Sequence, residues 1–315
     1  MRCARFGLLL AWCVMVCGSV TIARAQEASP PPRIVVSLAP LAGITRALLP
    51  EGAKVETLIP PGASEHGYDI PPSKLSSLAN ADLVVYVGLG LEPQVEKYVK
   101  DHSRPGRRDV GFAAAVGIKA DEHDHDEHED HDHHHHGADP HLWLDPILVK
   151  QFAPLLAAEI SALGREGPRT AELVGARRDA FVKRVDELDA AYRAMVQAAP
   201  RKTMIVGHDA YGHLAGRYGL TTIAIAGLAA SEPTPSAIAA VSAAAREKGV
   251  TTIFVEPQLS RGVASRIASA CNLQVRVLDP LGDGDWLGLM RKNLAEIGEA
   301  LGAPPPAVPA APQPK

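Results

Sequence analysis

The chain is short of cysteine and of aromatic residues, and both shortages limit what it can do. Of its four cysteines, Cys3, Cys13 and Cys17 lie in the N-terminal leader, which leaves Cys271 alone in the rest of the chain. A lone cysteine forms no intramolecular disulfide and no metal site built from cysteine pairs. Aromatic residues make up 4% of the chain, too few for a platform on which nucleic-acid bases would stack.

A hydrophobic run long enough to cross a bilayer is also missing. The apolar run at residues 6–20 is shorter than the ~20 residues that a membrane-spanning helix needs. It follows Arg2 and Arg5 and precedes the letters "ARA", which is the pattern of a secretory signal. Residues 1–25 are therefore predicted to be a signal peptide cleaved after Ala25, with an uncleaved anchor as the alternative.

Net charge is low outside one segment. The formal net charge is -4, and the leader arginines contribute +3 to it, so the chain after the leader carries -7. Residues 121–136 alone contribute -8. The remainder is close to neutral, which argues against nucleic acid as a partner.

Short β-branched runs alternate with helix-like segments in two series. The first series begins with "RIVVSL" at residue 33 and the second with "KTMIVG" at residue 202. This alternation predicts an α/β fold with two (βα)-repeat lobes, each with a parallel sheet. We place the N-terminal lobe at residues 26–165 and the C-terminal lobe at 201–302. Residues 303–315, rich in proline and alanine, are predicted to be a disordered tail.

One long helix is predicted between the lobes, within residues 166–200. Its apolar positions recur at steps of three and four and form one face, made by Phe181, Val185, Leu188, Tyr192 and Met195. About thirty residues give a rod of roughly 45 Å, long enough to run along both lobes. A coiled-coil dimer is the alternative, but we expect a linking helix in a monomer.

Metal-capable side chains fall at or soon after strand-like runs in both series. His66 and His141 belong to the first lobe, and His208 and Asp279 belong to the second. Parallel sheets bind ligands beyond the carboxyl ends of their strands, so these residues are predicted to meet in the cleft between the lobes. Three imidazoles and one carboxylate suit four-coordinate Zn²⁺. Taken singly, each residue also fits a solvated loop or a turn.

Residues 121–136 are all histidine or acidic. Eight of the 13 histidines lie in this tract: His123, His125, His128, His131, His133, His134, His135 and His136. The tract offers many donor atoms but no packed scaffold to hold them. Each metal ion that binds there must therefore order a flexible loop, and the loss of conformational entropy weakens binding. We expect an auxiliary loop that binds several metal ions weakly, and a solvated linker is the alternative.

The segments around these candidates resemble the cluster A-I solute-binding proteins of bacterial metal ABC importers, specifically the zinc-binding ZnuA type. The resemblance runs from about residue 33 to 301. In it, "GASEHGYD" implies His66 as a ligand, "DPHLWLDP" implies His141 and "VGHDAYGHL" implies His208. The words "FVEPQLS" and "LDPLG" resemble the region that supplies a fourth carboxylate, Asp279, and Glu65 is the alternative fourth ligand. Zinc-type members often carry a His-rich loop just before the second ligand.

This resemblance implies a high-affinity periplasmic protein that captures Zn²⁺ and delivers it to an inner-membrane ABC zinc permease, and that is not an enzyme. A manganese-binding protein of the same family is one alternative. Manganese-type relatives resemble this chain elsewhere but carry an acidic residue where His208 stands, so this position separates the two interpretations. A free-standing periplasmic zinc buffer or chaperone is another. A zinc hydrolase would need an open coordination position and a general base, and the sequence has no HExxH motif.

Three further residues near these motifs are predicted to be bystanders or supports. His102 is expected at a solvated helix end, and His213 is expected beside the site or on the surface. Glu256 follows the strand-like run "TTIFV" and is expected to hydrogen-bond a ligand or a neighbouring backbone group.

Overall fold

The computed structural model describes residues 31–119, 138–163, 168–226, 234–258 and 262–305. The predicted signal peptide, the tract at 121–136 and most of the predicted tail lie outside these residues. No helix within the described ranges is long and apolar enough to cross a membrane.

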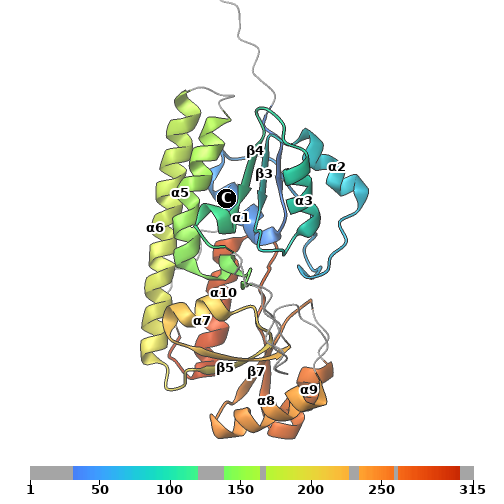
Figure 1. Cartoon of the computed structure of the whole chain (residues 1–315). Coiled ribbons are helices and arrows are strands. Elements are labelled where there is room, and N and C mark those ends of the chain that lie inside the picture. Colours follow the sequence, from blue (N-terminus) through green and yellow to red (C-terminus); the bar gives the residue numbers. More distant parts are fainter. Residues whose placement is uncertain (1–30, 120–137, 164–167, 227–233, 259–261, 306–315) are drawn as a thin grey trace, which may run out of the picture.

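The first lobe is built on a four-stranded parallel sheet. Its strands are β1 (Ile34–Val36), β2 (Val55–Thr57), β3 (Leu83–Tyr86) and β4 (Arg108–Gly111), in the order β2-β1-β3-β4. Helices α1 (Ala39–Leu48), α2 (Pro72–Asn80), α3 (Pro93–Asp101) and α4 (Phe112–Ala115) follow these strands in turn (Figure 1). The two central strands are buried almost throughout, as is usual for parallel sheets covered by helices.

The second lobe repeats this topology. Strands β5 (Thr203–His208), β6 (Thr221–Ala226), β7 (Thr252–Val255) and β8 (Gln274–Val277) form a parallel sheet in the order β6-β5-β7-β8. Its helices are α7 (Gly212–Tyr218), α8 (Pro235–Glu247), α9 (Gly262–Cys271) and α10 (Trp286–Leu301). The predicted α/β fold with two parallel-sheet lobes is therefore confirmed.

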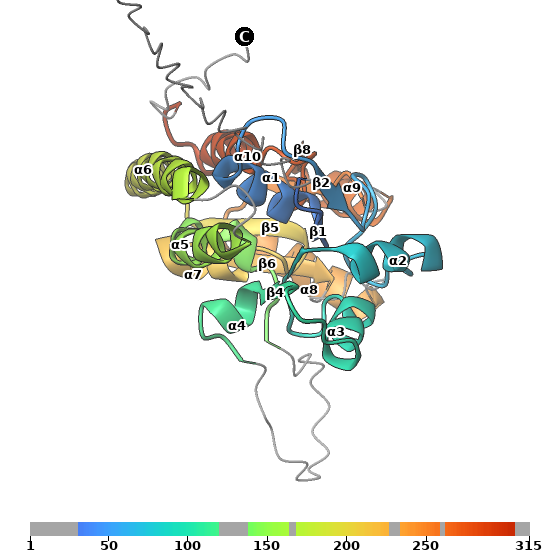
Figure 2. The same cartoon turned by 90° about the horizontal axis from the view of Figure 1, so that it is seen from above.

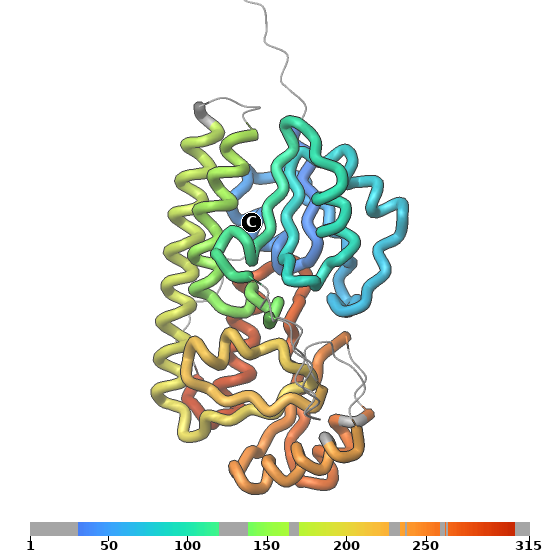
Figure 3. The backbone as a smooth tube through the Cα atoms, viewed as in Figure 1, coloured from blue at the N-terminus to red at the C-terminus, as the bar shows by residue number. Residues whose placement is uncertain are grey.

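One long helix connects the lobes, and a second long helix lies beside it. Helix α5 (Pro146–Ala162) packs beside α6 (Pro168–Ala198), and both lie on one flank of the molecule (Figure 2). The backbone trace in Figure 3 shows α6 running past both lobes, as the sequence predicted. The predicted apolar face of α6 is buried against α5, α1 and α10 of the same chain. Because this face is covered by the same chain, it is not exposed for pairing with a second copy in a coiled coil.

The main hydrophobic core crosses from one lobe to the other. Trp286 at the start of α10 packs against Phe181 of α6, with ring centroids 5.7 Å apart. Helix α1 of the first lobe approaches α10 so closely that a Cβ atom on Gly43 would lie 2.7 Å from the Trp286 backbone nitrogen. A larger residue at position 43 would force the two helices apart. The lobes are thus joined by packed side chains as well as by α6.

Candidate metal centre

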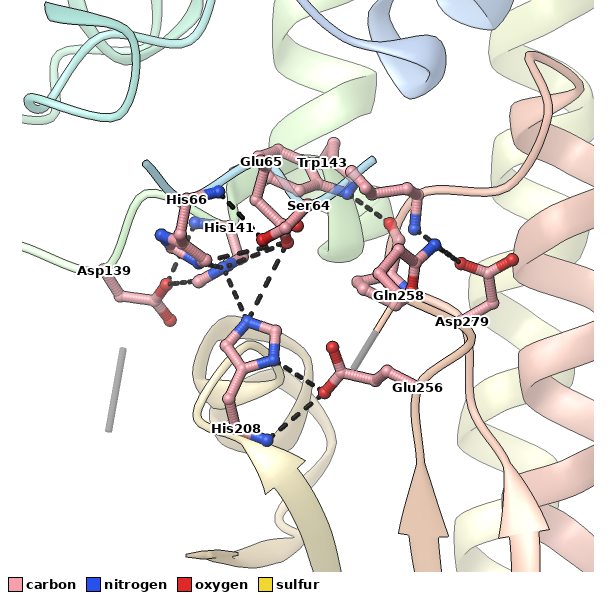
Figure 4. Close-up of polar contacts among 12 residues, drawn as sticks. Ser64, Glu65, His66, Asp139, His141, Trp143, His208, Glu256, Gln258 and Asp279 are labelled. Carbon is pink, nitrogen blue, oxygen red and sulfur yellow. Dashed lines mark hydrogen bonds and ion pairs between the residues drawn. The ribbon is translucent and has the colours of Figure 1, made fainter. Parts of the chain in front are cut away.

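Three separate segments bring the predicted histidines together between the two lobes. His66 lies in the loop between β2 and α2, and His208 is the last residue of β5. His141 directly precedes a short 3₁₀ helix, η1 (Leu142–Leu144), that leads into α5. Figure 4 shows the side chains of these three residues pointing toward one another. His66 and His208 thus lie after or at the carboxyl ends of strands β2 and β5, as the sequence predicted.

The potential ligand atoms converge on one point. The Nε2 atom of His141 lies 3.1 Å from that of His66 and 3.2 Å from that of His208. Glu65 Oε1 lies 3.9, 3.7 and 3.8 Å from the Nε2 atoms of His66, His141 and His208. These four residues form the only group of its kind among the residues that the structure describes, with ligand atoms all within 4.8 Å of one another.

These spacings fit a tetrahedral zinc ion. Bonds of about 2.0–2.1 Å at tetrahedral angles put neighbouring donor atoms roughly 3.3 Å apart, close to the distances between the imidazole nitrogens. The Glu65 carboxylate is 2% exposed, and its buried Oε1 atom has no hydrogen-bond partner in the protein. A buried carboxylate oxygen without a partner is costly, and a cation between it and the three imidazoles would remove that cost.

Neighbouring carboxylates orient two of the imidazoles. Asp139 Oδ1 lies 2.7 Å from Nδ1 of His141, and Glu256 Oε1 lies 2.6 Å from Nδ1 of His208. A carboxylate at Nδ1 keeps the proton on that nitrogen and leaves the Nε2 lone pair for a metal. The expectation that Glu256 would hydrogen-bond a ligand candidate is therefore met, whereas sequence reasoning missed Asp139. Its signal was its position two residues before His141, within reach of that ring.

Burial and charge shift the pKa values of the centre in different directions. Burial lowers the pKa of His66 to about 4, so this ring is neutral at physiological pH. Burial also opposes a charge on His141, but the carboxylates of Asp139 and Glu65 outweigh it and raise its pKa to about 9. For Glu65, burial is likewise outweighed by the three histidines, and its pKa is lowered. Glu65 is therefore an anion that is ready to bind a cation.

Asp279 is not brought into the cluster. Its Oδ1 atom accepts hydrogen bonds from the backbone of Leu281 and Gly282, at 3.0 and 3.1 Å, and from Gln258 Nε2 at 3.0 Å. These bonds hold the turn after β8, and Figure 4 shows Gln258 between Asp279 and the histidines. Of the two carboxylates considered from the sequence, the geometry favours Glu65.

The remaining predicted histidines have clear positions. His102 caps the end of α3 at the surface, with Nδ1 3.2 Å from the Tyr98 carbonyl oxygen. His213 lies beside the centre, with Nε2 2.9 Å from the Asp139 carbonyl oxygen. The eight histidines of the tract lie outside the described residues.

Comparison with known proteins gives the family. The family model described as "ZnuA: Zinc-uptake complex component A periplasmic" matches residues 34–300. The chain belongs to the ZnuA family. The high-affinity zinc uptake system protein ZnuA of Bacillus subtilis is 29% identical over 302 residues, which cover 91% of this chain and 93% of that protein.

Solved structures agree with this assignment. A crystal structure of ZnuA superimposes with a TM-score of 0.73 at 27% identity, covering 86% of this chain and 99% of that one. A zinc-bound ZnuA with residues 138–173 of its own numbering deleted also gives a TM-score of 0.73, at 28% identity, covering 87% and 100% of the two chains. The long interlobe helix and the two parallel sheets are thus shared with ZnuA family members.

Proposed function

We propose that this protein is the periplasmic zinc-binding component of an ABC importer, which captures Zn²⁺ and passes it to an inner-membrane permease. The observation that carries the proposal is the convergence of three imidazoles and one buried carboxylate, whose Oε1 atom accepts no hydrogen bond, on a single point. The family description and the zinc-uptake relatives support the same cargo and compartment. Export through a signal peptide at residues 1–25 and a monomeric state belong to this proposal.

The donor set supports capture of a metal rather than catalysis. Glu65, His66, His141 and His208 would fill all four positions of a tetrahedral zinc ion, whereas catalytic zinc sites keep one position for water. Histidine nitrogens also favour zinc over manganese, which prefers oxygen donors. We therefore propose zinc as the cargo and no enzymatic role.

Zinc is expected to bind at least 100-fold more tightly than manganese. The reason is the donor set, together with the position of zinc above manganese in the general affinity order. Competition titration of the mature protein with each metal, against a chelator of known affinity at one pH, measures the ratio. A manganese constant equal to the zinc constant would favour the manganese importer instead.

The fourth ligand is proposed to be Glu65. Glu65→Gln removes the anionic donor while keeping the shape of the side chain, so zinc affinity is expected to fall at least tenfold. Asp279→Asn is the matched control, because it changes a carboxylate that bonds Gln258 and a turn rather than the cluster. The same chelator competition tests both variants. A larger loss in Asp279→Asn than in Glu65→Gln would reverse the assignment.

The tract at residues 121–136 is proposed to be an auxiliary, low-affinity metal loop. None of the four candidate ligands of the tight site lies within it. A variant lacking residues 121–136 is expected to keep one tight zinc site and to lose weaker ones, as measured by calorimetric titration. Loss of the tight site in that variant would make the tract the primary binder.

A further inference from the structure

The segment 139–145, which contains His141, is bonded to the second lobe although the sequence assigns it to the first. The Trp143 indole nitrogen donates to the Pro280 carbonyl oxygen at 2.7 Å, just after β8. The indole nitrogen of Trp286, in α10, donates to the Trp143 carbonyl oxygen at 2.8 Å. Two hydrogen bonds thus fix the middle of this segment, called here the His141 segment, to the second half of the chain.

Helix α7 of the second lobe holds both ends of the His141 segment. At the first end, His213 Nε2 lies 2.9 Å from the Asp139 carbonyl oxygen and donates to it. At the other end, Arg217 contacts the Asp145 carboxylate through Nε and Nη2, each 2.9 Å from Oδ2. Asp145 is 2% exposed, so this ion pair is largely buried on the carboxylate side, where removing one partner is costly.

The approach of α7 to the segment is close. A Cβ atom on Gly212, the first residue of α7, would lie 2.8 Å from Asp139 Oδ2. The other oxygen of the same carboxylate, Oδ1, bonds both the backbone nitrogen and Nδ1 of His141. Contacts between α7 and Asp139 therefore bear directly on where the His141 ring points.

Helix α7 is also tied to His208. His208 ends β5, and α7 begins four residues later, at Gly212. The first lobe, in contrast, holds the loop that carries Glu65 and His66. In that loop the Ile59 nitrogen donates to the Ser37 carbonyl oxygen, and the Ile70 nitrogen donates to Gln94 Oε1 at 2.8 Å. The four candidate ligands thus divide into two pairs that are held by different lobes.

We propose that His213 and Arg217 are positioning residues, which hold the His141 segment on α7 so that His141 and His208 form one preassembled half of the site. The inference rests on the proposed zinc-binding function. Neither residue touches the metal position, and each acts through an aspartate at one end of the segment. When the ligand side chains are already held in the binding geometry, less conformational entropy is lost as the metal binds, and affinity is higher.

Variants of the full mature protein test the two contacts that hold the His141 segment on α7, one made by His213 and the other by Arg217. His213→Leu removes the donor to Asp139, and His213→Gln keeps an N–H donor. Arg217→Met alone would leave the buried Asp145 charge unpaired and endanger folding, so it is combined with Asp145→Asn, which retains an N-cap for α5. Arg193→Met is the control. Arg193 pairs with Asp189 and lies over the ring of Tyr218, the last residue of α7.

Zinc affinity by chelator competition and the visible absorption of bound Co²⁺ are the two readouts. We expect His213→Leu and the Arg217→Met, Asp145→Asn double variant to bind zinc about 10-fold more weakly or worse, and to alter the tetrahedral cobalt spectrum. His213→Gln and Arg193→Met are expected to stay near wild type. A merely structural role would lower the melting temperature without changing the cobalt spectrum.

Two results would contradict the positioning role of His213 and Arg217 while leaving the proposed zinc-binding function in place. One is wild-type affinity and an unchanged cobalt spectrum in both disabled variants. The other is an equal loss in Arg193→Met. If the wild-type protein did not bind zinc tightly, the proposed zinc-binding function would be contradicted, and the positioning role that rests on it as well.

Discussion

Replacing His208 by alanine is expected to weaken zinc binding more than 100-fold. Loss of an outer-shell partner typically costs 10–100-fold in metal affinity, and His208 would be an inner ligand. Its ring is 1% exposed, with Nε2 3.2 Å from that of His141 and Nδ1 fixed by Glu256. Alanine would leave the remaining three donors with an open position. Chelator competition at pH 7.5 measures the loss.

His102→Ala is the matched control for this prediction. It removes an imidazole at the exposed end of α3, so the zinc affinity of that variant should equal that of the wild type. Similar affinities in His208→Ala and the wild type would show that the tight site lies elsewhere in the chain.

Zinc is expected to raise the free energy of unfolding by about 4 kcal/mol when free zinc is a thousandfold above its dissociation constant. The candidate ligands come from segments up to 143 residues apart in sequence. The unfolded chain does not hold them together, so zinc binds the native state preferentially. Thermal or denaturant unfolding of the mature protein, in zinc held by a chelator buffer, measures the increase.

The increase should depend on pH through His141. The pKa of His141 is about 9 in the metal-free protein, above the ordinary value near 6.5. The proton on this ring therefore stabilises the metal-free fold fully below pH 6.5, and that stabilisation disappears as the pH rises through 9. Zinc must displace this proton, so the stabilisation by zinc should grow by about 1.4 kcal/mol per pH unit between pH 6.5 and 9.

His66 contributes nothing to this slope, because its pKa of about 4 leaves it neutral throughout that range. Unfolding at pH 6.5, 7.5 and 8.5 at one free zinc concentration tests the sign. A zinc effect that is absent, or that shrinks as the pH rises, would contradict binding at the deprotonated His141 ring.

Much of the fold was predictable from the sequence because its signals are local. Strand β1 consists of β-branched apolar residues only, and β5 has an apolar centre at residues 204–206. The apolar spacing along α6 marks the face that the structure buries. His66 and His208 could be singled out because parallel sheets bind ligands beyond their carboxyl ends. The family resemblance left Glu65 and Asp279 as alternative fourth ligands, and the sequence could not decide between them because the direction of a loop side chain depends on its tertiary contacts.

The support around the site depends on contacts between distant residues. The hydrogen bond from Trp143 to Pro280 joins residues 137 positions apart, and that from Trp286 to Trp143 spans 143. No periodicity or spacing in a single sequence indicates such pairs. For the same reason, the sequence does not indicate that the His141 segment attaches to the second lobe, and the predicted boundary places this segment in the first lobe, residues 26–165.

Anomalous diffraction at the zinc absorption edge, from crystals of the zinc-loaded protein, tests the central claim most directly. The predicted result is one strong peak between the lobes, at about 2.0–2.2 Å from Nε2 of His66, His141 and His208 and from a carboxylate oxygen of Glu65. A strong peak beside Asp279, or a peak that lacks any of the three imidazoles, would contradict the metal centre described above.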